Sequence, residues 1–237
     1  MSHKPQWQPG RVGEGTTGLV HGYGSNGIAA FLGTQNLAGM SSTFCEAVSE
    51  TSRVAILKYG HDTATKAQAA AHEAGHVIVA TAIGEIITAA RLTKHRAMGR
   101  TVWLGSNHRI CPGSELDRYF NIANEPMAAL RIAINSVAGF FGEMQVRLNH
   151  PSSSIDERYK TTVICAELDR VWGKPDELTA ALVGFVVRTS LETNIPRFDA
   201  IRAHLTRTGR LTQGEAKRLL ESVIPFDLED AVKEFVR

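Results

Sequence analysis

Two histidines and a glutamate lie close together in the stretch AAAHEAGHVIVATAIGE, as His72, Glu73 and His76. On a helix, residues i and i+4 share a face with their Cβ atoms about 5–6 Å apart, so both imidazoles can bind one ion. Neutral imidazole is a good ligand for Zn²⁺. Zinc lowers the pKa of a bound water, and the carboxylate of Glu73 can accept the proton as a general base. The H-E-x-x-H pattern therefore predicts the zinc helix of a metallopeptidase.

The same residues also fit a second interpretation, a histidine pair in the core that has this spacing by chance. With nine histidines in the chain, the probability of one chance match is on the order of a percent, a real false-positive risk for a bare motif. The surroundings favour the metal. Ala74 and Gly75 would allow another element to approach closely, and titratable groups are costly in an apolar helix unless they are paired or bound.

A catalytic zinc site usually has three protein ligands and one open position, so a further ligand is needed. Asp156 follows three serines at the start of a predicted helix, where it could be a ligand or could complement the helix dipole. Glu143 is the rival, because it lies late in a long apolar helix where a charge needs a partner. Gly139 and Gly142 would let that helix pack close to the predicted zinc helix.

The other titratable side chains near these segments are expected to be solvated or structural. Glu167 and Asp169 are assigned to a solvated helix face, and the cluster Lys94 to Arg96, which includes His95, to a solvated turn. The remaining histidines have no ligand-like neighbour: His3, His21, His61, His108, His150 and His204.

Helices and one hairpin must position these residues. The first helix is expected over 64–84, with Asp62 and Thr63 as caps and Gly84 at its end. Two β-prone runs, 85–93 and 100–105, are separated by a glycine-containing turn and predict a hairpin. Further helices are expected over 125–148, 152–173, 174–194, 196–209, 212–222 and 225–237. The sequence predicts a mainly helical α+β fold, with the HExxH helix and a small hairpin followed by a C-terminal helical bundle.

Two regions differ in composition. Residues 1–47 are rich in Gly, Ser, Thr and Asn and predict a flexible N-terminal arm. Residues 48–237 are expected to form the folded domain that carries the zinc site.

The overall composition favours a cytoplasmic protein with no affinity for nucleic acid or membranes. A net charge of +2 without a Lys/Arg run gives no support to nucleic-acid binding. Cys45, Cys111 and Cys165 fit neither a disulfide framework nor a CxxC zinc site. No apolar run reaches the roughly 18 residues of a membrane span. The N-terminus lacks the apolar core of a signal peptide, and a phosphate-binding G-x-x-x-x-G-K-[ST] loop is absent.

The stretch HEAGHVIVA resembles the zinc-protease domain of the FtsH-type family. Three further stretches are similar to that family in the same order. ITAARLTKHRAMGRTVWLG resembles its strand, basic turn, Ala-x-Gly and second strand. NSVAGFFGEMQVRL resembles a helix usually written Gly-x-x-Ala-Glu, and SSSIDERYKT resembles a stretch with Ser-x-Asp and a later Thr. The resemblance covers roughly residues 66 to 190.

The resemblance implies a Zn²⁺ site with its roles assigned residue by residue. His72, His76 and Asp156 would hold the ion, and Glu73 would be the general base. Glu143 would accept the ring N–H of a ligand histidine rather than bind the metal itself.

The resemblance also implies a role for the hairpin. An exposed edge strand beside the zinc would align the substrate backbone, and Thr101, Val102 and Trp103 are the matching segment. An ordinary amphipathic hairpin that covers the core explains the same pattern equally well.

The chain departs from the FtsH-type family because its sequence predicts neither an AAA+ ATPase domain nor membrane helices. Three alternatives stay open: cleavage of unfolded chains without ATP, recruitment of a separate ATPase or adaptor, and cleavage of one specific partner. The sequence favours a stand-alone zinc endopeptidase that acts on a protein or peptide. A non-catalytic zinc-containing binding module on the same scaffold is the alternative. The sequence leaves open whether the chain forms an oligomer.

Overall fold

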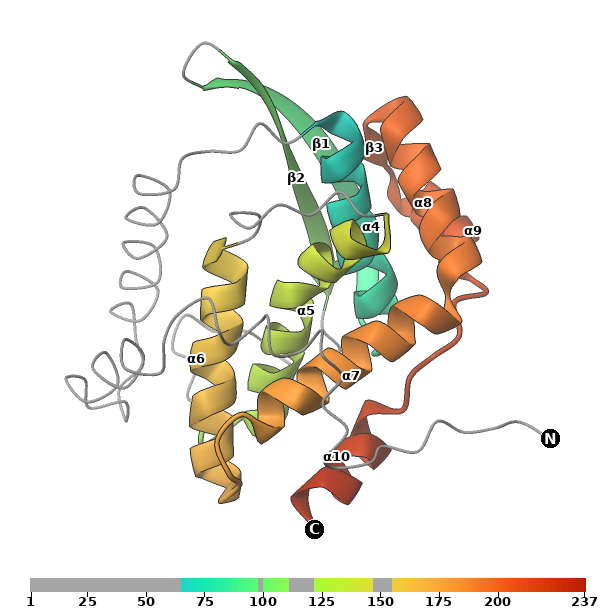
Figure 1. Ribbon diagram of the computed structural model, residues 1–237. Helices are drawn as coiled ribbons and strands as arrows, with labels where there is room; N and C mark the ends of the chain where they lie inside the picture. The colour runs from blue at the N-terminus through green and yellow to red at the C-terminus, as the bar shows by residue number, and fades with distance from the viewer. Residues whose placement is uncertain (1–64, 98–99, 111–121, 147–154) are drawn as a thin grey trace.

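The computed structural model describes residues 65–97, 100–110, 122–146 and 155–237 (Figure 1). The described helices and strands are α4 (Lys66–Ala82), β1 (Ile86–Ala97), β2 (Arg100–Ile110), α5 (Pro126–Gln145), α6 (Ile155–Trp172), α7 (Leu178–Thr193), α8 (Ile195–Thr208), β3 (Arg210–Leu211), α9 (Gln213–Leu220) and α10 (Leu228–Val236). The predicted mainly helical α+β class with a small sheet is confirmed. The predicted arm over 1–47 lies outside the described residues.

Helix α4 carries the HExxH motif through the middle of the molecule (Figure 1). It is buried along nearly its whole length and packs against α5, α7, α8 and the sheet. The hydroxyl of Thr65 caps the helix by accepting a hydrogen bond from the backbone N–H of Gln68 at 3.1 Å. The predicted caps Asp62 and Thr63 were wrong, because the helix begins at Lys66 and the cap directly precedes it. Gly84, with φ +87°, follows the helix end, as predicted.

Helices α4 and α5 cross closely because small residues meet at their contact. A Cβ atom on Gly75 would overlap the carbonyl oxygen of Ala138, and one on Gly142 would lie 2.5 Å from the carbonyl oxygen of Ala71. A Cβ atom on Gly139 would overlap the rings of the histidines on α4. The prediction that Gly139 and Gly142 let the two helices approach is confirmed.

The sheet has the strand order β2-β1-β3, and both strand pairs are antiparallel. Strand β2 therefore lies at an edge of the sheet. The hairpin of β1 and β2 is longer than predicted and projects beyond α4 (Figure 1). The short strand β3 was not predicted. It follows Gly209, which ends α8 in the left-handed conformation, and it pairs Leu211 with Ala90.

Helices α5 and α6 lie side by side, and α7 crosses their lower ends (Figure 1). Glu167 and Asp169 on α6 were predicted to be solvated, but both are buried. Asp169 accepts a hydrogen bond from the backbone N–H of Thr179 at 2.8 Å, and so satisfies a donor in the first turn of α7. Glu167 pairs with Arg170 one turn later at 2.5 Å. Both carboxylates thus have structural partners.

Within the described ranges, we find no helix whose length and apolar character would let it span a bilayer.

Candidate metal centre

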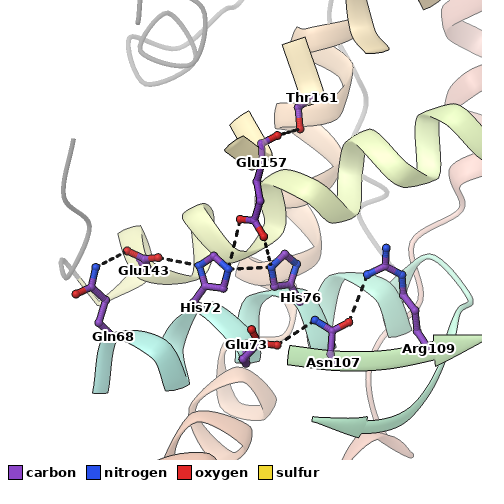
Figure 2. A network of polar contacts seen from close by, with 9 residues as sticks. All are labelled: Gln68, His72, Glu73, His76, Asn107, Arg109, Glu143, Glu157 and Thr161. Atoms are coloured by element: carbon purple, nitrogen blue, oxygen red, sulfur yellow. Dashed lines mark hydrogen bonds and ion pairs between the residues drawn. The ribbon is translucent and has the colours of Figure 1, made fainter. Parts of the chain in front are cut away.

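The two motif histidines point toward each other from one face of α4 (Figure 2). Their Nε2 atoms are 3.0 Å apart, and their rings meet edge to face with centroids 4.7 Å apart. His76 is buried, while His72 is partly exposed. The i, i+4 spacing thus brings the two nitrogens together as the sequence predicted.

A carboxylate on α5 orients the first histidine. Oε1 of Glu143 lies 2.8 Å from Nδ1 of His72, and Oε2 of Glu143 accepts a hydrogen bond from the amide of Gln68 at 2.9 Å. Because Glu143 accepts at Nδ1, the lone pair of Nε2 is left for an ion. This is the position that the resemblance implied for Glu143. Gln68, one helical turn before His72, donates a further hydrogen bond to the same carboxylate.

A second carboxylate reaches the histidines from the first turn of α6. Glu157 lies between them, with Oε2 3.3 Å from Nε2 of His72 and Oε1 3.3 Å from Nε2 of His76 (Figure 2). Donor atoms about 2.0–2.1 Å from a tetrahedral zinc are themselves separated by roughly 3.3 Å. The two imidazoles and this carboxylate are thus spaced like the ligands of a metal ion.

Asp156, the ligand implied by the resemblance, immediately precedes Glu157 in the first turn of α6. The placement of its side chain lies outside the structural description. In this turn, the described carboxylate that contacts both histidines is that of Glu157, which the sequence pattern did not indicate.

Glu73, the predicted general base, is buried where α4 faces β2. Its Oε2 accepts a hydrogen bond from the side-chain amide of Asn107 at 3.0 Å. Its other oxygen lies against Gly105, where a Cβ atom would overlap it. Within the described chain, ligand atoms of His72, Glu73 and His76 lie within 4.8 Å of one another. The carboxylate is therefore close to the two ring nitrogens and beside an edge strand.

The predicted substrate segment belongs to this edge strand. Thr101 is exposed, Val102 is buried, and Trp103 is partly buried with the ammonium of Lys66 5.3 Å from its ring centroid. The β2 residues beside the Glu73 carboxylate are Gly105 and Asn107, further along the strand. The hairpin thus covers α4 and also presents an edge. It has features of a core-covering hairpin and of a substrate-aligning edge strand.

His72 and Glu157 shift each other's pKa values in opposite directions. Burial by itself lowers the pKa of His72, but the charge of Glu157, together with hydrogen bonds that the ring donates to Glu143 and Glu157, raises it well above its ordinary value. Burial likewise raises the pKa of Glu157, and the two histidines outweigh this and lower it. A positive charge on His72 is therefore stabilised by the carboxylate of Glu157.

The other residues discussed from the sequence lie outside this cluster where the structure describes their side chains. Lys94 and Arg96 are exposed, as expected, and the side chain of His95 is outside the structural description. His108 is exposed, while Nε2 of His204 on α8 lies 3.5 Å from Oε1 of Glu215 on α9. Of the cysteines, Cys165 is buried in the core with an unpaired thiol, and burial raises its pKa.

Comparisons of this chain with protein-family models, with curated proteins and with solved structures found no match.

Proposed function

We propose that this chain is a zinc-dependent endopeptidase that hydrolyses peptide bonds without ATP. The observation that carries the proposal is the convergence of two ring nitrogens and one carboxylate at mutual distances of 3.0–3.3 Å, with Glu73 beside them. This arrangement supplies three ligands and a base, which is the set that a hydrolytic zinc site needs.

The ligands would be His72, His76 and a carboxylate from the first turn of α6. Glu157 is the described candidate, and Asp156 is the alternative implied by the resemblance. Zinc, when bound, would lower the pKa of a water molecule and polarise the scissile carbonyl. Glu143 holds the ring of His72 in the tautomer that presents Nε2 to the ion.

Glu73 would take the proton from the attacking water and pass it to the leaving amine. Its position beside β2 supports this role, since an extended peptide could add to the free edge of that strand through main-chain hydrogen bonds. Such pairing depends little on side chains, so we expect broad selectivity toward unfolded or extended segments. The substrate that we propose is therefore a protein or peptide.

Cleavage of casein by the purified chain, without ATP, tests the proposal. Wild-type protein, wild type with a chelator, and Glu73→Gln are compared, with Glu192→Gln on an exposed surface of α7 as the matched control. We expect cleavage only by untreated wild type and by the control. Equal cleavage by Glu73→Gln would contradict the assigned base. Zinc binding without cleavage of casein or of an unstructured peptide library would favour the non-catalytic binding module.

A further inference from the structure

The carboxylate of Glu73 rests in a recess on one face of β2. Gly105 and Asn107 are two residues apart on this strand and so share a face. Gly105 leaves the room that the carboxylate occupies, since a Cβ atom there would overlap Oε1 and Cδ of Glu73. Asn107 donates its side-chain amide to Oε2 at 3.0 Å. The strand therefore gives the carboxylate both space and a hydrogen-bond donor.

A third residue on the same face fixes the orientation of the Asn107 amide. Nη1 of Arg109 donates to Oδ1 of Asn107 at 3.3 Å (Figure 2). A guanidinium can only donate, so Oδ1 must be the accepting end and the NH₂ group must face Glu73. The reversed amide would place two donors together at Arg109 and two acceptors together at Glu73.

Arg109 is itself anchored on a buried group. Its Nε lies 3.0 Å from Oε2 of Glu85, whose Oε1 accepts a hydrogen bond from Asn135 on α5 at 2.8 Å. Glu85 and Asn135 are both buried. A continuous chain of polar contacts thus connects the core beside α5 to the carboxylate next to the candidate metal centre.

We infer that Asn107 is a positioning residue that holds the carboxylate of Glu73 in place for proton transfer. The inference rests on the proposed function, because Glu73 acts as a base only if the chain is a hydrolase. Arg109 and Glu85 act indirectly, because they fix the orientation of the Asn107 amide. Gly105 supplies the space that the Glu73 carboxylate occupies. A residue that only bound substrate would affect KM, whereas a residue that acts through Glu73 affects kcat.

The first test is the kinetics of peptide hydrolysis by Asn107→Leu, which has a similar size but no donor. We expect kcat to fall roughly ten- to a hundredfold, as for a misplaced catalytic group, while KM and zinc content stay close to wild type. Asn107→Gln keeps the amide and should recover part of kcat. Glu192→Gln, on an exposed surface of α7, is the control and should keep full activity. An unchanged kcat, or a change confined to KM, would overturn the inference.

The second test measures the contact itself and needs no activity. Asn107→Leu leaves the buried carboxylate without its donor, so we expect Tm to fall by roughly 3–6 °C in the Glu73 protein. In a Glu73→Ala background, the same substitution should lower Tm much less. Equal shifts in both backgrounds would overturn the inference. Zinc-loaded wild type that hydrolyses nothing would instead contradict the proposed function, so the two failures are distinguishable.

Discussion

Glu143 on α5 and His72 on α4 are joined by a hydrogen bond of 2.8 Å between Oε1 and Nδ1, although 71 residues separate them in the chain. The contact fixes which ring nitrogen of His72 faces Glu157 and His76. It is possible because the two helices cross at glycines, so that a carboxylate on one helix can reach a ring on the other.

We therefore predict that Glu143→Gln weakens zinc binding by roughly 10–100-fold, the usual effect of losing a carboxylate that orients a ligand histidine. The glutamine retains the size of the side chain but replaces the charge that favours an N–H at Nδ1. Chelator competition with the purified protein measures the affinity, and Glu192→Gln is the control for loss of one carboxylate. An affinity equal to that of wild type would show that His72 needs no such partner.

The identity of the third ligand gives a second prediction. Because Glu157 contacts both ring nitrogens, we predict that Glu157→Ala lowers zinc affinity by more than roughly 100-fold. This exceeds the loss of roughly 10–100-fold expected for a carboxylate that only orients a ligand. Asp156→Ala should lose much less. The reverse order in a chelator titration would mean that Asp156 is the ligand, as the resemblance implies, and that Glu157 pairs with the histidines only in the metal-free protein.

A third prediction concerns pH. The pKa of His72 is raised above 6.5, mainly by Glu157 acting against burial. Below that raised pKa, zinc must displace a proton, so its apparent affinity should fall about tenfold for each further pH unit. In the metal-free protein the sign is opposite: protonated His72 stabilises the fold fully below about 6.5, and this contribution is lost as pH rises through the raised pKa.

Zinc affinity and metal-free unfolding, both measured between pH 5.5 and 8.5, check this prediction. Affinity that increases with pH while metal-free stability decreases would agree with it. Affinity that does not change over this range would show that His72 is already neutral when the metal arrives.

The local sequence was sufficient to predict the helix that carries the HExxH motif and the helix that crosses it. His72, Glu73 and His76 are placed by helical periodicity alone, and Glu143 was identified because a lone carboxylate in an apolar helix needs a partner. The glycines at 139 and 142 indicated where the two helices would meet. Rules that act within one helix thus singled out these residues, whereas the contact of Glu143 with a ligand histidine was implied by the resemblance.

The remaining residues of the site depend on how separate elements are placed. Successive residues on a helix point about 100° apart, so no sequence pattern decides whether Asp156 or Glu157 faces the histidines. Gln68 had a usable signal, since it precedes His72 by one turn on the same face. Asn107 and Gly105 had none, because the register of β2 against α4 is set by tertiary packing. The two-residue strand β3 was not predicted, because its pairing with β1 is also set by tertiary packing.

The close crossing of α4 and α5 gives a fourth prediction, which concerns stability. A methyl group on Gly142 would lie 2.5 Å from the carbonyl oxygen of Ala71 and 2.9 Å from Cα of Gly75. These are backbone atoms and cannot move aside without separating the helices, so Gly142→Ala should lower the free energy of unfolding by roughly 1–3 kcal/mol. The separation should also weaken zinc binding, because it moves Glu143 away from His72.

Gly214→Ala is the matched control, since this exposed glycine in α9 has no atom within 4 Å of the added carbon. Alanine is the better helix former, so this variant should be more stable by up to about 1 kcal/mol. Urea unfolding of the metal-free proteins measures both changes, and chelator competition measures the zinc affinity. If Gly142→Ala were as stable as wild type and bound zinc equally well, α5 would have to tolerate a wider crossing, and the contact between Glu143 and His72 would not depend on glycine at this position.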